Sequence, residues 1–363
     1  MPEADGTPPA KKPRKPAPRW VKILVGVVAV LDVILIIVYI TGGSGGSSKS
    51  ATDETTVPAA PTTTPTPTAT AAPTPASSAW SSFIGVQADQ TSDFAQISAI
   101  GVKRVRVDDP SANTITTAAR FGITVLPEAD FEPWPDLNGG KGDKYPPLPQ
   151  NDKTWADRMI AQWTSLPTPP AAIEVWNEPW LSSFWEPAPD PVAYYNLVKV
   201  FATEAWKTWP NVQILVSSDS ADPSGTIKWR ARLLAADTSG LLKDPRIHPV
   251  THNYVQGRTP TQVTAEPCSL DLDRYQCAYN DYKAHGNPNP TVWVTEFGWE
   301  SGVVGAQSQA DYTVQALNIF KNSREVAEAY SFFYETNSTF DYNWLNPDNS
   351  PKPIVAAVKK LIG

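Results

Sequence analysis

From residue 80 onward the chain alternates short apolar runs with amphipathic segments, and this alternation is the feature that most limits its fold. The apolar runs indicate buried strands, and the segments between them have helical periodicity. The predicted strands cover residues 83–89, 102–108, 123–129, 172–177, 212–218, 250–255, 291–296 and 329–335. The predicted helices cover residues 93–100, 115–121, 155–166, 191–209, 227–236, 274–284, 310–322 and 354–362. This pattern predicts an α/β fold, a closed parallel (β/α)8 or TIM barrel over residues 80–363.

Residues 1–40 have a different composition. Residues 1–19 are rich in Pro, Ala, Lys and Arg and have no apolar periodicity, so we expect a disordered basic tail. Residues 20–40 contain an apolar run of 18 residues, broken only by Asp32, and no small-residue cleavage site follows it. We therefore expect an uncleaved transmembrane signal-anchor helix rather than a cleaved signal peptide. Basic residues before this helix predict a cytoplasmic tail, a single-pass protein of the cell membrane, and an extracellular remainder.

Residues 41–79 are rich in Gly and Ser at first and in Thr, Pro and Ala later. This composition predicts a disordered linker, flexible and then semi-extended, whose Thr and Pro content permits O-glycosylation. The linker would act as a stalk between the membrane and the barrel. The 284 residues that follow are enough for one large core.

Charge and cysteine usage exclude some classes of partner. Residues 80–363 carry 23 Lys and Arg against 32 Asp and Glu, a net charge of −9, so no nucleic-acid partner is expected. The three histidines form neither an H-x-x-x-H pair nor a cluster with cysteine, so no metal site is expected. Cys268 and Cys277 are close together, and in an exported domain they predict a disulfide; two free thiols are the alternative.

Two predicted strands each end on a glutamate. Asn177-Glu178-Pro179 ends the fourth strand, because Pro179 cannot continue a strand ladder, and Glu296 ends the seventh just before Gly298. Catalytic groups of (β/α)8 barrels lie at these C-terminal strand ends. Other polar residues that the same prediction places there are Asp108, Asp109, Glu128, Asp219, His252, Tyr254 and Glu335.

Two carboxyl groups facing each other across a barrel mouth suit glycosidic bond hydrolysis, in which one protonates the leaving oxygen and the other attacks or activates water. In these two motifs the chain resembles the retaining (β/α)8-barrel glycoside hydrolases of clan A, which carry Asn-Glu-Pro at the end of strand four and a nucleophilic Glu at the end of strand seven. The resemblance covers most of residues 80–363. It implies that Glu178 is the acid/base, that Glu296 is the nucleophile, and that no cofactor is required. For either glutamate alone, a solvated loop acid is the alternative.

The resemblance also implies supporting residues. Asn177 would bind the sugar 2-hydroxyl, or cap the turn at the strand end. His252 and Tyr254 match a strand-six pair, in which the Tyr hydroxyl bonds the nucleophile and keeps it ionised; core packing is the alternative. Arg106 alternates onto the inward face of its strand, where it would contact the nucleophile and favour its ionised form; a surface position is the alternative.

Aromatic residues near the upper loops are candidate platforms for sugar rings. We expect Trp180 and Trp299 to serve as substrate-binding platforms and Trp176 to lie in the core. The family often carries a Trp at the end of strand eight, where this chain has Phe333-Tyr334-Glu335. This departure leaves the particular family open among cellulase-like, mannanase-like, β-1,3-glucanase-like, xylosidase-like and arabinofuranosidase-like relatives.

The sequence thus predicts a monomeric, membrane-anchored, extracellular glycosidase that cleaves O-glycosidic bonds of a cell-wall or extracellular poly- or oligosaccharide by double displacement. The carboxyl separation expected for retention is about 5 Å. A transglycosylase would share every residue named above, and an inactive carbohydrate-binding barrel is a further alternative. Sparse histidine and the lack of a Gly-rich phosphate loop after strands seven and eight argue against metal or phosphate-ester chemistry.

Overall fold

The computed structural model describes residues 80–363 apart from 131–133, 220–227, 264–267, 269–270 and 337–339. In this part, eight parallel strands close into a barrel, each pairing with the next and β8 pairing with β1. The strands are β1 (Ile84–Gln87), β2 (Arg104–Asp108), β3 (Thr124–Ala129), β4 (Ala172–Val175), β5 (Gln213–Ser217), β6 (Ile247–His252), β7 (Val292–Phe297) and β8 (Val326–Ser331). The predicted (β/α)8 barrel is confirmed.

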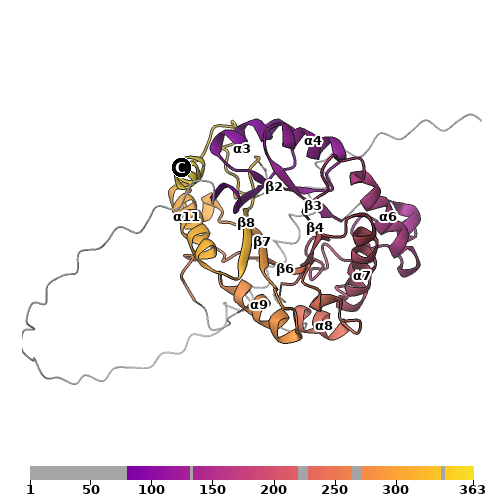
Figure 1. Cartoon of the computed structure of the whole chain (residues 1–363). Helices are drawn as coiled ribbons and strands as arrows, with labels where there is room; N and C mark the ends of the chain where they lie inside the picture. Colours follow the sequence, from indigo (N-terminus) through magenta and orange to yellow (C-terminus); the bar gives the residue numbers. More distant parts are fainter. Residues whose placement is uncertain (1–79, 131–133, 220–227, 264–267, 269–270, 337–339) are drawn as a thin grey trace, which may run out of the picture.

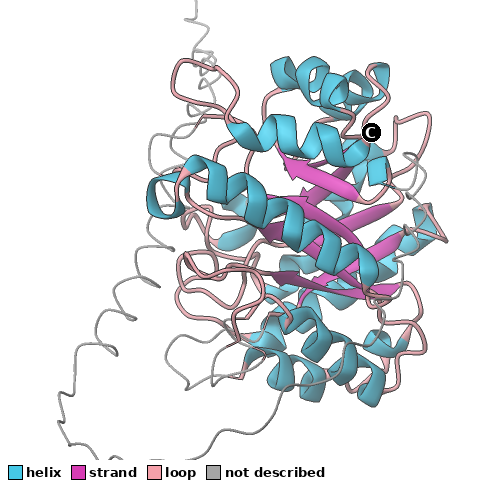
Figure 2. Ribbon diagram, turned by 90° about the vertical axis from the view of Figure 1, so that its left-hand side faces the viewer, coloured by secondary structure: helices cyan, strands magenta, loops and turns pink. Residues whose placement is uncertain are grey.

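Helices surround the strands as an outer ring (Figure 1), and the side view shows them packed along the length of the barrel (Figure 2). The main helices are α3 (Phe94–Ile100), α4 (Ala112–Arg120), α6 (Asp152–Trp163), α7 (Pro191–Thr208), α8 (Trp229–Ala236), α9 (Arg274–His285), α11 (Ala306–Asn322) and α12 (Pro353–Ile362). The shorter ones are η1 (Thr91–Asp93), α5 (Pro135–Asn138), η2 (Pro149–Asn151), η3 (Leu241–Lys243) and α10 (Ser301–Val304).

The predicted tail, membrane helix and linker, residues 1–19, 20–40 and 41–79, lie outside the described residues. Within the described ranges, no helix combines the length and the apolar character that crossing a bilayer requires.

Some element boundaries differ from the prediction for physical reasons. Helix α4 begins before residue 115, because the Ser111 hydroxyl caps it by accepting from the Thr114 backbone N–H at 3.1 Å. Strand β8 ends at Ser331. The Phe332 N–H still donates to the Phe297 carbonyl of β7 at 2.8 Å, whereas the Tyr334 N–H donates to the Gln87 carbonyl of β1 at 3.0 Å. Glu335 therefore lies in the loop beyond β8 and not at a strand end.

The barrel interior is filled in two layers. An apolar layer at the base consists of Leu126, Ala172, Leu215, Val250, Trp293 and Tyr330. The Tyr330 ring needs a glycine beside it, because a Cβ on Gly85 would lie 2.2 Å from that ring. Above this layer the interior is charged and polar, with Arg106, Glu174 and Thr295 fully buried. The polar layer lies toward the C-terminal strand ends and forms the base of the candidate site.

The two ends of the described chain meet on the opposite face. Ser81, which precedes β1, lines the same surface hollow as Gly101, Ile362 and Gly363. Gly101 follows α3 and precedes β2, so this hollow lies at the N-terminal ends of the strands. The chain therefore enters and leaves the barrel on the face away from Glu178 and Glu296.

The predicted disulfide is present. Cys268, in the loop between β6 and α9, is bonded to Cys277 of α9, with their Cα atoms 5.6 Å apart. The bond ties the loop to the helix that follows it.

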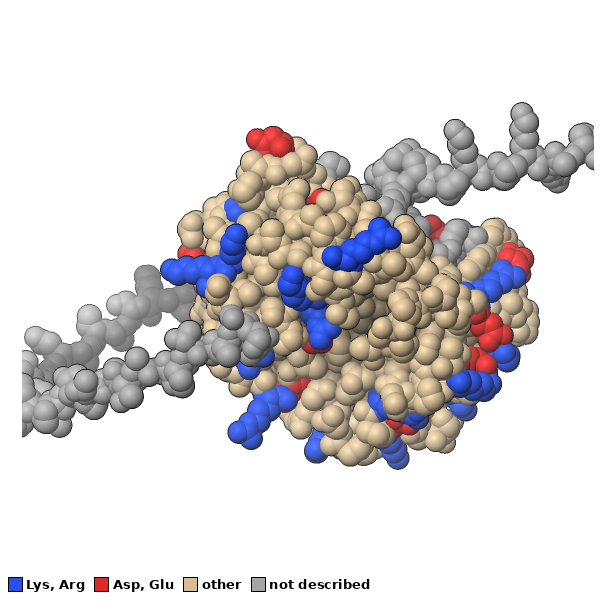
Figure 3. All heavy atoms as spheres, turned by 45° about the horizontal axis from the view of Figure 1, so that its top comes forward, with Lys and Arg blue, Asp and Glu red and all other residues tan. Residues whose placement is uncertain are grey.

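The surface charges are mixed. Figure 3 shows Lys and Arg side chains that lie singly between neutral residues, or beside acidic ones at one edge, with no continuous basic patch on that face. Exposed pairs such as Lys153–Asp157 and Arg158–Asp136 are examples of this local neutralisation.

Candidate active site

The two predicted catalytic glutamates come together at the C-terminal ends of β4 and β7. One carboxylate oxygen of Glu178, one of Glu296 and one ring nitrogen of His252 all lie within 4.8 Å of one another. Glu296 is the penultimate residue of β7, and its neighbour in the β6–β7 register is His252. A register shift between Thr251 and His252 adjusts this pairing at the strand end.

Glu178 reaches the site through a strained turn. Trp176 and Glu178 have φ angles of 67° and 40°, in the left-handed region that non-glycine residues rarely adopt. The turn is held by the Trp176 indole N–H, which donates to the Phe184 carbonyl at 2.8 Å, and by the Ser217 hydroxyl, which donates to the Trp176 carbonyl at 2.8 Å. Such strain is typical of functional sites whose surroundings hold the backbone in place.

Both oxygens of the Glu296 carboxylate are held by donors. Arg106 Nη1 lies 2.8 Å from Oε1, and the Tyr254 hydroxyl donates to Oε2 at 2.8 Å. Charge-assisted hydrogen bonds of this length fix the plane of a carboxylate. Arg106 and Tyr254 thus lie where the sequence analysis expected contacts to the nucleophile, and Arg106 is buried rather than on the surface.

Glu178 is in a different environment. Burial raises the pKa of its carboxyl, the hydrogen bond from His252 opposes this, and repulsion by Glu296 and Asp219 adds to the rise, leaving the pKa above its ordinary value. Its Oε1 lies 2.8 Å from His252 Nδ1. Glu178 thus keeps its proton to higher pH than an ordinary glutamic acid, beside a carboxylate that Arg106 and Tyr254 hold in place.

His252 bridges the two glutamates. Its Nδ1 is also 3.4 Å from Glu296 Oε2, while Nε2 is 3.2 Å from the Thr295 hydroxyl. Burial lowers the pKa of His252, but Glu296, Glu174 and Glu178 outweigh it and raise the pKa to about 10. The spacing of Glu178, His252 and Glu296 would also suit a metal ion. A protonated imidazole has no free lone pair to offer one, so metal binding here would require His252 to lose its proton.

Arg106 is the centre of a buried network that the sequence analysis did not foresee. Besides Glu296, its guanidinium contacts Glu174 at 2.7 Å, Glu128 at 2.8 Å and the Gln87 side-chain oxygen at 2.7 Å. Together with Glu296, these partners come from four different strands, β1, β3, β4 and β7. The sequence does contain a sign of this role for Glu174, because it is a charged residue between apolar neighbours in a strand. Successive side chains of a strand point to opposite faces, so this alternation could have placed Glu174 on the inward face of the barrel.

Replacing Arg106 with methionine is expected to lower the free energy of unfolding by about 3–5 kcal/mol, because it leaves buried carboxylates without a counter-charge. Urea denaturation followed by tryptophan fluorescence measures the change. Arg158→Met is the control, since Arg158 makes an exposed pair with Asp136 and a surface cation–π contact with Trp134, and its loss should change stability little. Equal effects of the two substitutions would contradict a structural role for the buried network.

The other predicted binding residues differ in their placement. Asn177 lies in the site, where its Oδ1 accepts from Arg106 Nη2 at 3.2 Å. Trp180 lies with its ring edge-to-face against His252, with ring centroids 5.3 Å apart, and so forms part of the wall. Trp299 does not line the cleft: its side chain is buried, its indole N–H donates to the Arg258 carbonyl at 2.7 Å, and its ring packs on Phe297 in the core.

Two aromatic residues beside the site were missed from sequence. The Tyr254 ring makes edge contacts with Phe332 and Tyr342, at centroid distances of 6.1 and 5.3 Å. Phe332 directly follows β8, and the peptide bond between Phe332 and Phe333 is cis. The aromatic residue nearest the end of strand eight is therefore Phe332, one position before the segment that the prediction considered.

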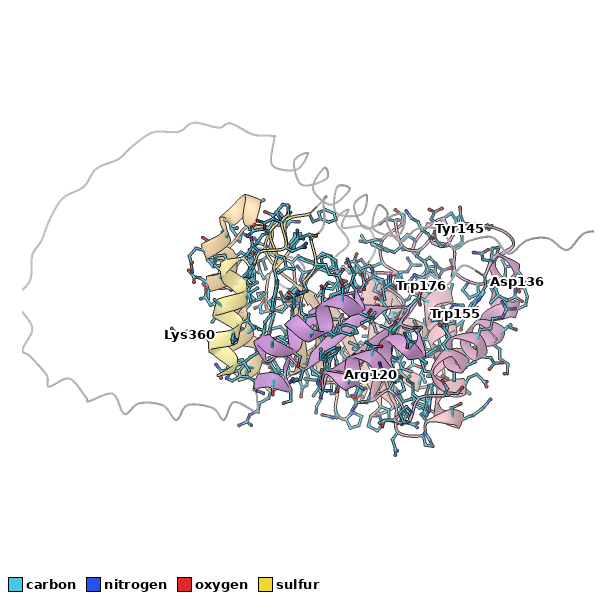
Figure 4. The ribbon with its side chains drawn as sticks, turned by 90° about the horizontal axis from the view of Figure 1, so that it is seen from above. Arg120, Asp136, Tyr145, Trp155, Trp176 and Lys360 are labelled. Atoms are coloured by element: carbon cyan, nitrogen blue, oxygen red, sulfur yellow. A yellow bond between two sulfur atoms is a disulfide. The ribbon has the colours of Figure 1, made fainter. Side chains whose placement is uncertain are left out.

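Trp176 lies in the core, as predicted. Its ring packs 6.1 Å from Trp155 and 5.1 Å from Trp185. Figure 4 shows Trp176 near Trp155 and below Tyr145, and these three residues line one small pocket together with Trp134 and Leu137. This pocket is separate from the two glutamates.

Comparisons with known proteins define the fold. No protein-family model matches the chain, and no curated protein matches it. A solved family 39 glycoside hydrolase from Bacteroides cellulosilyticus WH2 is similar at 19% identity with a TM-score of 0.59; the match covers 78% of this chain and 64% of that one. An endo-β-1,3-glucanase from Sorangium cellulosum matches at 14% identity with a TM-score of 0.52, over 77% of this chain and 98% of that one.

A third similar structure is a β-1,3-glucanase and pollen allergen of Cryptomeria japonica, at 14% identity and a TM-score of 0.52, over 74% of this chain and 97% of that one. The chain thus spans somewhat less than two thirds of the family 39 enzyme. At these identities the likeness establishes the (β/α)8 barrel fold.

Proposed function

We propose that this chain is a retaining glycoside hydrolase with Glu178 as acid/base and Glu296 as nucleophile. The observation that carries the proposal is the pair of carboxylate oxygens within 4.8 Å of each other at the ends of β4 and β7. Retaining enzymes place their two carboxyl groups about 5 Å apart, whereas inverting enzymes leave about 6.5–9.5 Å for a water molecule. The three similar structures named above are described as glycoside hydrolases or glucanases, which supports the same assignment.

The proposed reaction has two displacements. In the first, Glu296 attacks the anomeric carbon while Glu178 gives its proton to the glycosidic oxygen, the glycosidic bond breaks, and a glycosyl ester forms on Glu296. In the second, Glu178 takes a proton from water, which attacks the anomeric carbon and releases Glu296. Arg106 and Tyr254 hold the nucleophile in its attacking orientation, and Asn177 is positioned for the sugar 2-hydroxyl.

We further propose that the substrate is an extracellular poly- or oligosaccharide and that the enzyme acts as a monomer at the cell surface. The apolar run at residues 20–40 supports a single membrane anchor. β-1,3-Glucan is the first substrate to test, because two of the similar structures are named as β-1,3-glucanases.

The test is hydrolysis of β-linked polysaccharides and aryl glycosides by the full chain, with the anomeric configuration of the first product followed by NMR. We expect cleavage with retained configuration. An inverted first product would overturn the nucleophile assignment. Binding of a glycan without cleavage of any member of a broad panel would favour the inactive carbohydrate-binding alternative.

The pH dependence follows from the environment of Glu178. Because the pKa of Glu178 is raised, its acid form persists to higher pH than that of an ordinary glutamic acid, and kcat/KM should fall as pH rises through that value. We expect the midpoint of this alkaline limb above the ordinary glutamate pKa of about 4.3. Measuring kcat/KM against pH for the wild type and for Glu178→Gln tests the assignment. If the alkaline limb of the pH profile persists in Glu178→Gln, another group is responsible for it.

A further inference from the structure

A second group of acidic side chains lies beside the candidate active site and takes no part in the proposed reaction. Asp108 and Glu128 are neighbours in the β2–β3 register, and Asp130 follows one residue after β3 ends. One carboxylate oxygen from each of the three lies within 4.8 Å of the others. This acidic cluster consists of Asp108, Glu128 and Asp130.

The cluster has carboxylate oxygens without hydrogen-bond donors. Both oxygens of Asp130, Oε1 of Glu128 and Oδ1 of Asp108 are buried and have no hydrogen-bond partner. Asp130 and Glu128 are each 1% exposed. A buried, uncompensated carboxylate is costly, and native proteins rarely leave such oxygens without a donor, a proton or a metal ion.

The nearest cation does not neutralise the cluster. Arg106 Nη2 contacts only Oε2 of Glu128, at 2.8 Å, and the same guanidinium also serves Glu174 and Glu296. The other oxygen of Glu128, Oε1, has no hydrogen-bond partner. Three carboxylates therefore share part of one positive charge.

We propose that Asp108, Glu128 and Asp130 bind a divalent cation, and specifically Ca²⁺. Calcium takes carboxylate oxygens at about 2.3–2.6 Å, so one ion can bond oxygens up to about 5 Å apart. Magnesium, at about 2.0–2.1 Å, would need these oxygens within about 4 Å of one another and dehydrates reluctantly. Carboxylates are the hard ligands that such ions prefer over the softer transition metals.

The burial of the cluster favours an ion over a sugar. The unpartnered oxygens of Asp130 are covered, so a sugar hydroxyl cannot reach them without displacing protein, whereas Asp108 is partly exposed and gives an ion a way in. Water can supply the remaining ligands. An ion bound to Glu128 would also restrain Arg106, which contacts both Glu128 and Glu296. The acidic cluster would thus help to position Glu296 without touching the substrate.

The experiment measures metal content and thermal stability and needs no knowledge of the substrate. The full chain, purified in detergent without chelator, is analysed for bound metals; it is then treated with EDTA, dialysed and titrated with Ca²⁺ while Tm is recorded. We expect about one Ca²⁺ per chain. We also expect Tm to rise with Ca²⁺ concentration, because an ion that binds only the folded state stabilises that state.

Asp130→Asn provides a test with a distinctive sign. The variant should lose bound Ca²⁺ and the Tm response, yet its metal-free Tm should equal or exceed that of the metal-free wild type, because one buried charge is removed. Asp157→Asn, on the exposed side of α6, should keep both bound Ca²⁺ and the response. If Asp130→Asn does not fold, Asp108→Asn at the partly exposed ligand gives the same comparison.

A wild-type chain without bound metal whose Tm is constant across millimolar Ca²⁺ would overturn the proposal and leave protons as the occupants of the cluster. An unchanged Ca²⁺ response in Asp130→Asn would also overturn it, and a rise with Mg²⁺ alone would overturn the choice of ion. These readouts are independent of hydrolysis, so they separate a failure of this site from a failure of the proposed function.

Discussion

Replacing Glu296 with alanine is expected to lower kcat on aryl glycosides by at least ~10⁴-fold, since loss of a nucleophile removes the covalent step itself. The cavity left by the side chain should admit a small anion. With azide added, we expect turnover to be partly restored and the product to be a glycosyl azide of inverted configuration, because azide attacks the anomeric carbon from the side that Glu296 occupied. Product NMR measures the configuration directly.

The control for this experiment is the folding of the variant. Arg106 keeps Glu128 and Glu174 as partners when Glu296 is removed, so the far-UV spectrum and the cooperative unfolding transition should be retained. Asp311→Ala, at an exposed position on α11, should leave kcat at the wild-type level. Full activity of Glu296→Ala would exclude Glu296 as the nucleophile.

Replacing Glu178 with alanine is expected to cost about 10²- to 10⁴-fold in kcat/KM on substrates with poor leaving groups, which is the usual contribution of a general acid. An aryl glycoside with a very good leaving group needs little protonation, so its first displacement should be slowed much less. A plot of log kcat/KM against leaving-group pKa should therefore be steeper for Glu178→Ala than for the wild type.

Azide distinguishes the two glutamates. In Glu178→Ala, the intermediate on Glu296 still forms, and azide then displaces it with retained configuration, opposite to the result for Glu296→Ala. A leaving-group dependence unchanged from the wild type would show that another residue supplies the proton. His252 would then be the first candidate, because it contacts both glutamates.

The fold could be predicted because strands of a parallel barrel are buried on both faces and appear as nearly continuous apolar runs. The same property misplaced β8. Its apolar run continues through Phe332, Phe333 and Tyr334, whose rings pack in the loop after the strand, and apolar character alone does not separate a strand from such a loop. The cap of α4 at Ser111 shows a boundary that local chemistry could have placed.

The site could be predicted only in its outer layer. Glu178 and Glu296 have recognisable neighbours, whereas the contact between Arg106 and Glu174 joins residues 68 positions apart and depends on how the closed barrel sets its strand register. Trp299 shows the same limit. Its position after strand seven predicted a platform, but its indole N–H donates to the Arg258 carbonyl and its ring packs on Phe297 in the core, contacts that only the folded chain brings together.

The entry and exit of the chain on one face have a consequence for how the enzyme meets its surroundings. Ser81 and Gly363 line a common hollow, while the glutamates occupy the opposite rim. The described part of the chain therefore begins behind the barrel, on the face away from the glutamates. A polysaccharide chain can therefore approach the open rim without meeting the point at which the N-terminal segment joins the barrel. Immobilisation of the enzyme through its N-terminus should leave access to long glycans as free as access to short ones.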